Sequence, residues 1–306
     1  MMLRNKDILS IVNLTKEELS QIFHEADNII KNPQRYADQL RGYVLATAFF
    51  EPSTRTKLSF QSAMLRLGGS IIDLPPEWAS SRAKGENLHD TIKMLDAYSD
   101  IIVVRHKIEG FAKYVAEIAE SPVINGGDGT RDHPTQAIID LYTIRRELGK
   151  LENLNVAVLG DLRYGRASRS FIFGISKYNP KNIYLISPEQ LRVRDEVKNY
   201  LRNKKINYIE TSNLTEYISD IDVLYVTRIQ KERFPDPIEY ERVKGSYKLT
   251  SSTLNNAKDS LIILHPLPRV DELSFDVDKL KYARYFVQAR YGVPIRMALL
   301  KLILRG

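Results

Sequence analysis

Apolar residues occur along this chain in two alternating patterns. Short runs in which nearly every residue is apolar are typical of buried parallel strands, and longer stretches with an apolar residue at every third or fourth position are typical of helices. The short runs predict strands at 43–50, 70–74, 101–104, 122–125, 155–160, 182–186, 206–210, 222–226 and 261–264. Because helical patterns separate many of these strands, the sequence predicts an α/β fold built from parallel βαβ units.

The first helix has the clearest boundaries. Thr15 and Glu18 have the spacing of a capping box, which predicts a helix over 15–30. The expected buried face of this helix consists of Leu19, Ile22, Phe23, Ala26, Ile29 and Ile30. Further helices are predicted at 56–67, with Leu58, Phe60, Ala63, Met64 and Leu67 at apolar spacing, and at 87–98, 109–119, 134–148 and 294–304. Pro294 is expected near the first turn of the last helix.

The length of the chain predicts two domains, since 306 residues exceed what one hydrophobic core usually serves. The helix at 134–148 ends at Gly149, and a polar connector follows at 150–153. We place the boundary there and predict two doubly wound parallel-sheet domains joined by long helices. The first would comprise residues 1–150, with a C-terminal helix at about 290–306 packing back on it, and the second residues 151–289.

Composition narrows the class of protein. The chain contains no cysteine, which excludes disulfides, cysteine zinc sites and a thiol nucleophile. Neither a membrane-spanning apolar run nor a signal-peptide layout is present, so a cytoplasmic protein is expected. The net charge of +7 comes from Lys and Arg residues that are interleaved with Asp and Glu along most of the chain. An anionic small molecule explains this surplus at least as well as nucleic acid does.

One segment between a predicted strand and a predicted helix combines hydroxyls with positive charge: Ser53-Thr54-Arg55-Thr56. At this position, the unpaired backbone N–H groups and the positive dipole end of the helix favour an anion. The three hydroxyls and the guanidinium of Arg55 add donors that match phosphate oxygens. A simpler interpretation, that Ser53 or Thr54 only caps the helix, explains the tetrapeptide equally well.

The turn after strand 155–160 has the glycine spacing of a phosphate-binding loop, with Gly160 and Gly165 five residues apart. Its chemistry does not fit a nucleotide site. Arg166 stands where the phosphate-binding lysine is required, and Ala167 stands where a magnesium-binding Ser or Thr is required. A dinucleotide-binding glycine pattern is also missing at this turn. We therefore interpret Arg166 as a planar donor to a carboxylate.

Three further polar segments follow predicted strands, where open α/β sheets bind ligands. They are His133-Pro134-Thr135-Gln136, the segment at 227–233, and His265-Pro266-Leu267-Pro268-Arg269. Each by itself is explained by an ordinary helix start, a solvated basic turn or a rigid surface turn. Together with the segment at 53–56, they favour one ligand site made from several strand ends.

A resemblance to a known family rests on Ser53-Thr54-Arg55-Thr56, Arg105, His133-Pro134-Thr135-Gln136, Arg166, Arg228-x-Gln230 and His265-Pro266-Leu267-Pro268. In order and spacing over nearly the whole chain, these residues resemble the catalytic chains of the aspartate carbamoyltransferase family. The related ornithine carbamoyltransferases have a cysteine where this chain has Pro266, and a Ser-Met-Gly loop that this chain lacks. The resemblance implies transfer of a carbamoyl group from carbamoyl phosphate to L-aspartate in pyrimidine biosynthesis, without a metal or a cofactor.

The resemblance also implies a role for each matching residue. The catalytic residues would be Arg55, Thr56, Lys84, Arg105 and His133, of which Thr56, Arg105 and His133 face the carbamoyl oxygen. The substrate-binding residues would be Ser53, Thr54, Ser80, Gln136, Arg166, Arg228, Gln230, Leu267 and Pro268, with the carbonyls of the last two accepting from substrate amino groups and a cis bond expected at Pro268. Domain closure would involve Glu51, Arg163, Arg233, Glu239 and Tyr240, with Glu51 bridging to Arg166 and Arg233.

The implied assembly is a homotrimer with shared active sites, in which Ser80 and Lys84 of the loop at 78–86 reach the neighbouring subunit's site. From the residues alone, a solvated loop is the simpler interpretation. Glu109 and Lys113 match positions at which regulated family members contact a zinc-containing regulatory chain, although an exposed charged helix face explains both residues. Two other functions stay open: a carbamoyltransferase for another carboxylated amine, and a noncatalytic anion-binding or RNA-binding protein. Neither nucleic acid nor a membrane is an expected partner.

Overall fold

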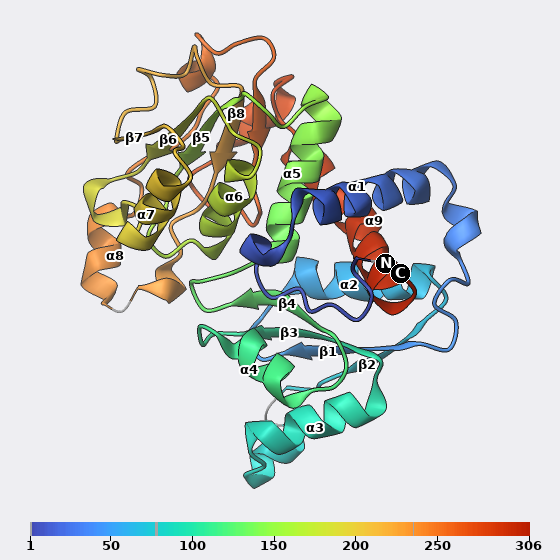
Figure 1. Ribbon diagram of the computed structural model, residues 1–306. Helices are drawn as coiled ribbons and strands as arrows, with labels where there is room; N and C mark the ends of the chain where they lie inside the picture. Colours follow the sequence, from blue (N-terminus) through green and yellow to red (C-terminus); the bar gives the residue numbers. More distant parts are fainter. Residues whose placement is uncertain (1, 77–78, 235) are drawn as a thin grey trace. The chain divides into compact units, whose positions relative to one another are not determined.

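The computed structural model describes residues 2–76, 79–234 and 236–306. The chain forms two compact units, and each has its own parallel sheet (Figure 1). Unit 1 contains residues 1–138 and 291–306, and unit 2 contains residues 139–290. Two long helices, α5 (Pro134–Leu148) and α9 (Tyr285–Leu304), contribute residues to both units. The predicted fold class, two parallel α/β domains joined by long helices, is confirmed.

The predicted domain boundary near residue 150 follows α5, whereas the compact units divide within this helix, between residues 138 and 139. The first residues of α5 therefore belong to unit 1 and its remainder to unit 2. A polar connector in the sequence shows where a helix ends, but it does not show which core the helix packs on.

Unit 1 contains a sheet of four parallel strands. From edge to edge they are β2 (Ser70–Asp73), β1 (Val44–Phe49), β3 (Ile101–His106) and β4 (Val123–Asp128). Phe49 lies opposite Arg105, and Val104 lies opposite Asn125. The carboxyl ends of β1, β3 and β4 therefore share one edge of the sheet, and the loops that leave this edge carry the polar segments predicted from the sequence.

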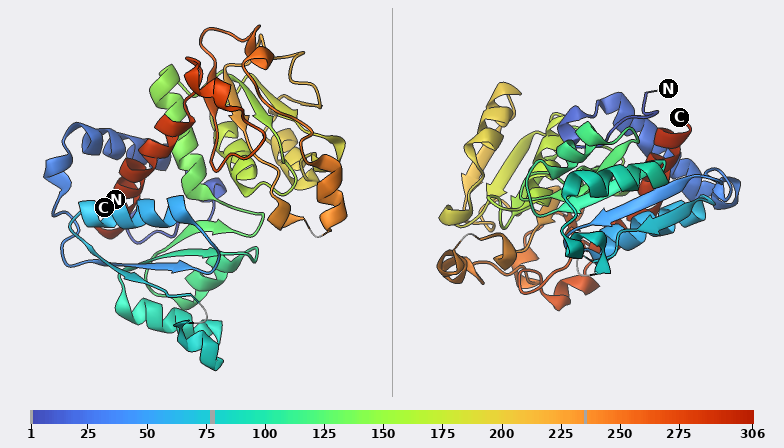
Figure 2. Two further views of the ribbon diagram at one scale, coloured as in Figure 1. Left: turned by 180° about the vertical axis from the view of Figure 1, so that it is seen from behind. Right: turned by 90° about the horizontal axis from the view of Figure 1, so that it is seen from below.

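Helices cover both faces of this sheet (Figure 2). Helices α2 (Thr54–Arg66) and α9 lie on one face, where the guanidinium carbon of Arg296 is 4.9 Å from the ring centre of Phe60. Helices α3 (Leu88–Tyr98) and α4 (Phe111–Ile118) lie on the other face. The core under α3 and α4 is made by alternate strand residues with helix residues: Ala46, Ala48, Ile102, Val104, Val123, Ile92, Leu95, Phe111, Ala112 and Val115.

Helix α1 (Lys16–Lys31) begins with the predicted capping box. The backbone N–H of Thr15 donates to Glu18 Oε2 at 2.8 Å, and the N–H of Glu18 donates to Thr15 Oγ1 at 3.2 Å. The assignment of Ile30 to the buried face was wrong, because Ile30 is 40% exposed; Leu58, one of the apolar residues at helical spacing in α2, is 57% exposed. Each residue of a helix is turned by about 100° from the one before it, so Ile30 and Leu58 lie outside the buried stripes of their helices.

Unit 2 contains a sheet of five parallel strands. From edge to edge they are β7 (Tyr208–Thr211), β6 (Asn182–Ile186), β5 (Asn155–Leu159), β8 (Val223–Val226) and β9 (Ile262–Leu264). Its helices are α6 (Arg166–Ser176), α7 (Asp195–Asn203) and α8 (Pro237–Val243). Side chains alternate between the two faces of the sheet: Tyr225 of β8 stacks on Phe171 of α6, whereas Leu224 and Val226 join the core on the opposite face.

The last helix, α9, begins at Tyr285, and Pro294 lies well inside it, so the prediction of Pro294 near the first turn was wrong. Proline cannot donate to the carbonyl four residues earlier, which costs a helix about 3 kcal/mol. Burial offsets this cost, since Ile295, Leu299 and Ile303 are fully buried on one stripe. Tertiary packing thus sets the start of this helix.

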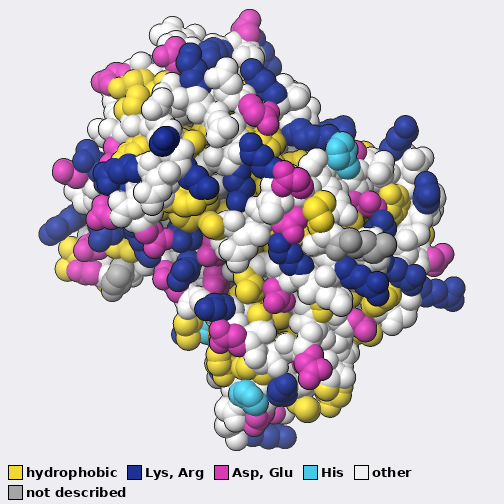
Figure 3. Space-filling view, in the orientation of Figure 1, with side chains coloured by type: hydrophobic (Ala, Val, Ile, Leu, Met, Phe, Trp, Pro, Cys, Tyr) yellow, Lys and Arg dark blue, Asp and Glu magenta, His cyan; other side chains and the backbone are white. Residues whose placement is uncertain are grey.

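Short 3-10 helices complete the fold: η1 (Ile11–Asn13), η2 (Pro33–Tyr36), η4 (Ser81–Lys84), η5 (Glu189–Leu191), η6 (Lys231–Arg233), η7 (Ser252–Leu254) and η8 (Phe275–Lys279). Among the described residues, no helix combines the length and the apolar character that crossing a membrane requires. On the face shown in Figure 3, basic and acidic side chains are interspersed, as the interleaved sequence predicts.

Gly160, at the end of β5, provides a test of close packing in unit 2. It has a φ of +130°, and a Cβ atom there would lie 2.1 Å from the Thr227 carbonyl oxygen and 2.3 Å from the Tyr247 hydroxyl. We expect Gly160→Ala to lower the free energy of unfolding by about 2–4 kcal/mol, through backbone strain and overpacking together. Denaturant titration at a fixed temperature would measure this loss.

Gly245→Ala is the matched control, because Gly245 also has a positive φ, +70°, but nothing lies within 4 Å of its Cβ position. The free energy of unfolding of Gly245→Ala should fall by only about 1 kcal/mol, because backbone strain is the only cost. Equal losses in the two variants would contradict the packing argument.

Candidate functional site

The hydroxyl-rich segment 53–56 lies where β1 leads into α2. Ser53 occupies the N-cap position of α2, but its side chain makes no capping hydrogen bond, and the first turn contains no acidic residue. Ser53 therefore does not cap the helix in the usual way. The backbone N–H groups of this turn and the hydroxyls of Ser53 and Thr54 form a group of donors at the positive end of a helix, as an anion site requires.

Arg105, the predicted ligand of the carbamoyl oxygen, is held in place at the end of β3. Its Nε donates to Glu51 Oε1 at 2.7 Å, and its Nη1 donates to the carbonyl of Gly126 at 3.3 Å. Both charged side chains are largely buried, with exposures of 15% for Arg105 and 14% for Glu51. Burial strengthens this ion pair and fixes the orientation of the guanidinium.

Thr56 and His133 meet at the same edge of the sheet. His133 follows β4 and immediately precedes α5, and its Nε2 is 3.5 Å from Thr56 Oγ1. Both residues are buried, and the side chain of Gln136 belongs to the first turn of α5. Unit 1 thus places a hydroxyl, an imidazole and a guanidinium at the carboxyl ends of neighbouring strands. These groups can donate hydrogen bonds to an oxygen that gains negative charge.

Ser80 and Lys84 lie at the two ends of η4, the 3-10 helix that follows β2. Ser80 is its N-cap residue, and Lys84 is exposed before Gly85, which has a φ of +95°. The guanidinium carbon of Arg82, in the same helix, is 5.3 Å from the ring centre of Phe50. Trp78, at the start of the predicted loop, lies outside the described residues. The rest of the loop forms a defined turn and is not simply a solvated chain.

Asp161 is a site residue that sequence reasoning missed. Fully buried after β5, it accepts hydrogen bonds from the backbone N–H groups of Arg163 at 3.1 Å and Tyr164 at 2.8 Å. Burial raises the pKa of its carboxyl from 3.8 to about 6, although these hydrogen bonds oppose the rise. Asp161 thereby fixes the conformation of the turn after β5. An acidic residue directly after a strand-ending glycine was the available signal.

The predicted carboxylate-binding arginines lie at the ends of adjacent strands in unit 2. Arg166 is the first residue of α6 and only 4% exposed, and Arg228 follows β8. Arg228 Nη1 donates to Glu232 Oε2 at 3.2 Å, and its Nη2 donates to Glu232 Oε1. Burial alone would raise the pKa of Glu232, but the hydrogen bond from Arg228, a backbone hydrogen bond and the charges of Arg228 and Arg233 together lower it. A carboxylate ligand at Arg228 would therefore meet a guanidinium that is already oriented.

The turn at 265–269 follows β9. The peptide bond between Leu267 and Pro268 is cis, as the resemblance implied, and Leu267 has a φ of +55°. His265 is buried, whereas Pro268 is exposed. Arg269, the last residue of this turn, forms two hydrogen bonds with Asp278, one of them from Nη2 to Oδ2 at 2.6 Å. The turn is therefore anchored at its start by the buried His265 and at its end by the hydrogen bonds from Arg269 to Asp278.

The remaining predicted closure residues of unit 2 are near its surface. Arg163 lines a basic pocket of about 510 Å³ together with Arg192, Arg194 and Lys198. Arg233 belongs to η6, and Glu239 and Tyr240 belong to α8. Ring contacts connect these segments, because Phe234 lies 5.0 Å from Tyr164 and 5.6 Å from Tyr240, measured between ring centres.

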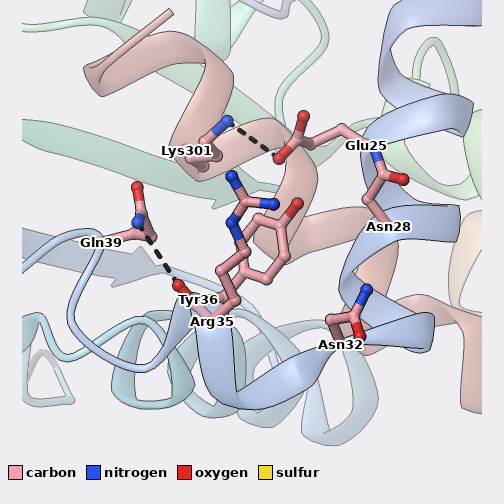
Figure 4. Close-up of a pocket in the computed structure, with 7 residues that line it drawn as sticks. All are labelled: Glu25, Asn28, Asn32, Arg35, Tyr36, Gln39 and Lys301. Carbon is pink, nitrogen blue, oxygen red and sulfur yellow. Dashed lines mark hydrogen bonds and ion pairs between the residues drawn. The ribbon is translucent and has the colours of Figure 1, made fainter.

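Another polar pocket, of about 320 Å³, lies in unit 1 between α1, η2 and α9 (Figure 4). It is lined by Glu25, Asn28, Asn32, Arg35, Tyr36, Gln39 and Lys301, none of which the sequence predicted as a site residue. The charge of Lys301 is balanced by Glu25, whose Oε1 is 2.9 Å from its Nζ. We therefore do not assign the anion site to this pocket. Among the described residues, no group of three or more His, Asp or Glu is placed to hold a metal ion.

Family descriptions match both halves of the chain. Residues 6–146 match the aspartate/ornithine carbamoyltransferase, carbamoyl-P binding domain. Residues 152–303 match the aspartate/ornithine carbamoyltransferase, Asp/Orn binding domain. Together the two descriptions cover nearly the whole chain.

Relatives with high sequence identity are named as catalytic subunits of aspartate carbamoyltransferase. The chain is 58% identical over 301 residues to the aspartate carbamoyltransferase catalytic subunit of Thermofilum pendens, covering 98% of this chain and 96% of that protein. It is 57% identical over 300 residues to the catalytic subunit of Korarchaeum cryptofilum, covering 98% of each.

Solved structures have the same fold over almost the full length. The aspartate transcarbamoylase of Trypanosoma cruzi in complex with carbamoyl phosphate and aspartate is 35% identical, with a TM-score of 0.94, covering 99% of this chain and 98% of that one. The catalytic subunit of M. jannaschii aspartate transcarbamoylase is 48% identical, with a TM-score of 0.87, covering 97% of each chain.

Proposed function

Because this chain belongs to the aspartate and ornithine carbamoyltransferase family, we propose that it transfers the carbamoyl group of carbamoyl phosphate to the amino group of L-aspartate. The products would be N-carbamoyl-L-aspartate and phosphate, in a reaction of pyrimidine biosynthesis. The observation that carries the proposal is the placement of Thr56, Arg105 and His133 at one sheet edge, beside a helix start suited to phosphate.

In unit 1, the first turn of α2 would bind the phosphate dianion of carbamoyl phosphate, with Ser53, Thr54 and Arg55 as side-chain donors. Thr56, Arg105 and His133 would donate to the carbonyl oxygen, which gains negative charge as the amine attacks, and Gln136 would contact the carbamoyl nitrogen. Donors that are already oriented stabilise this charge without reorganisation, which is the main source of such catalysis. The Glu51 carboxylate keeps the Arg105 guanidinium in one orientation.

In unit 2, Arg166, Arg228 and Gln230 would receive the two carboxylates of aspartate, and the carbonyls of Leu267 and Pro268 would accept from the substrate amino groups. Two guanidiniums at adjacent strand ends suit a dicarboxylate better than ornithine, whose side chain is cationic. This argument also disfavours a carbamoyltransferase for other amines. A noncatalytic anion-binding or RNA-binding role finds no support in the mixed surface charge of Figure 3.

The chemical step needs no covalent enzyme intermediate. The aspartate nitrogen forms a bond to the carbamoyl carbon, the carbon–oxygen bond to phosphate breaks, and the departing phosphate takes the amine proton. Orientation of the two substrates and electrostatic stabilisation of the carbonyl oxygen would supply the rate enhancement. The direct test is an assay for carbamoyl-aspartate from the purified chain with both substrates.

Arg55→Ala tests the phosphate site. Its contact strengthens as the leaving group gains charge, so turnover should fall by roughly 10²–10³-fold, equivalent to about 3–4 kcal/mol. The KM for aspartate should change less than threefold, because aspartate is held by unit 2. Steady-state kinetics would measure both. Arg35→Ala, which removes an exposed guanidinium elsewhere in unit 1, is the control. Turnover of Arg55→Ala within threefold of the parent would refute the assignment.

We also propose that the two units close on the bound substrates, with Glu51 bridging to Arg166 and Arg233 and with Arg163, Glu239 and Tyr240 rearranging. Glu51→Ala should weaken aspartate use and turnover, since the closed form loses its bridge. Carbamoyl phosphate binding should weaken less than aspartate use, through the loss of the carboxylate that orients Arg105. Solution scattering with N-(phosphonacetyl)-L-aspartate should show compaction of the parent and less in the variant. Glu117→Ala, in an exposed pair with Lys113, is the control. Equal compaction in Glu51→Ala and the parent would contradict closure through Glu51.

We further propose a homotrimer in which Ser80 and Lys84 complete the active site of a neighbouring subunit. Lys84 is exposed at the end of η4, and Leu58 and Leu65 of α2 are 57% and 62% exposed, which suits a subunit contact. Binding of a zinc-containing regulatory chain near Glu109 and Lys113 stays a prediction, as does a cytoplasmic location.

Complementation tests the shared site. Chains with Lys84→Ala and chains with Arg55→Ala are mixed in equal amounts, unfolded and reassembled. If each site takes Lys84 from a neighbour, about one quarter of the sites should combine an intact Arg55 with an intact Lys84, because neighbours in a randomly mixed ring are independent. Carbamoyl-aspartate formation should then far exceed that of either variant reassembled alone. A mixture no better than the average of the two variants would exclude sharing.

A further inference from the structure

The turn that carries Leu267 and Pro268 is held by the imidazole of His265. Leu267 has a φ of +55°, a left-handed conformation that is strained for a branched side chain. Its backbone N–H donates to His265 Nδ1 at 2.8 Å. A side-chain acceptor two residues earlier in the chain thus fixes the direction of this peptide group, and with it the conformation of the turn.

These contacts also fix the tautomer of His265. A backbone N–H can only donate, so Nδ1 is the acceptor and the ring proton is on Nε2. Nε2 lies 2.8 Å from Glu272 Oε1, which accepts this proton in a hydrogen bond. His265 is 1% exposed and Glu272 is 6% exposed. Burial lowers the pKa of His265; the Glu272 carboxylate opposes this effect, and the charges of Arg269 and Arg228 add to it, so that the net direction favours the neutral ring.

A second chain of hydrogen bonds holds the backbone of His265. Its N–H donates to Gln288 Oε1 at 2.9 Å, and Gln288 Nε2 donates to Asp140 Oδ1 at 2.6 Å. Gln288 and Asp140 are buried. The main chain of His265 is therefore held from α5 and α9, and Glu272, by accepting from Nε2, keeps Nδ1 free of a proton and available to the N–H of Leu267. Without the Glu272 carboxylate, the ring could carry its proton on Nδ1. That proton would point at the N–H of Leu267, and the turn would lose the hydrogen bond from Leu267 to His265.

We propose that Glu272 is a positioning residue: acting through His265, it orients the Leu267 and Pro268 carbonyls toward the amino group of the substrate. This inference rests on the proposed function, which assigns those carbonyls to the amine. It predicts a defect confined to recognition of the amino group. The phosphate site, in unit 1, and the carboxylate-binding arginines, on other loops of unit 2, would keep their ligands.

Succinate, a dicarboxylate without the amine, separates positioning from a general loss of structure. In Glu272→Ala, the KM for aspartate should rise at least tenfold, whereas the inhibition constant of succinate should stay within threefold of the parent. Glu272→Gln keeps an acceptor for His265 Nε2 and should hold the ratio of the two constants within threefold of the parent value. Glu216→Gln, an exposed carboxylate of unit 2, is the control and should match the parent.

Equal weakening of aspartate and succinate binding in Glu272→Ala, or no change in either, would overturn the proposal.

A measurement on the parent protein covers the case in which Glu272→Ala does not fold. Long-range proton–nitrogen NMR of chains with labelled histidine, of which there are five, should show His265 as the neutral tautomer with its proton on Nε2. A proton on Nδ1, or a doubly protonated ring at pH 7, would refute the inference. If the parent forms no carbamoyl-aspartate, the proposed function itself fails; an active parent with an unaffected Glu272→Ala refutes only the role of Glu272.

Discussion

Parallel strand pairing is the constraint on which the candidate site depends. In both sheets every strand runs in the same direction, so all carboxyl ends of one sheet emerge at one edge. The interiors of the central strands β1, β3, β5 and β8 are mostly apolar and buried, and they leave little room for charged groups. Polar chemistry is therefore concentrated at the last residues of these strands, such as Arg105, and at the first residues after them. Pairing of β1, β3 and β4 then brings together segments far apart in the sequence, such as Thr56 and His133.

Three arginines at or beside the candidate site are each oriented by a carboxylate of the same unit. Arg105 is bound to Glu51, Arg228 to Glu232, and Arg269 to Asp278. A flexible, solvated arginine would lose side-chain entropy when a ligand binds, whereas these guanidiniums have lost much of that freedom on folding. The acidic partners also reduce the mutual repulsion of the cations. The predicted anion-binding surfaces are thus organised by the fold itself.

Buried polar groups perform a different task in unit 2. Asp161 accepts backbone hydrogen bonds within the turn after β5, and the set of His265, Glu272, Gln288 and Asp140 supports the turn after β9. Loops at a ligand site have few apolar contacts of their own, so their conformation must be fixed by hydrogen bonds. Such networks are costly when incomplete, and this makes them effective in selecting one loop conformation.

The sequence by itself determined the kind and order of the elements and the chemistry at their ends. Buried strands, the capping box at Thr15 and the donor-rich start of α2 are local patterns, because each depends on residues within a few positions of one another. Tertiary structure decided what depends on distant contacts: the start of α9 ahead of Pro294, the exposure of Leu58, the role of Asp161, and the link from Asp140 to Gln288 across 148 positions. Burial and hydrogen bonding between distant segments have no local signature, so only the folded chain reveals them.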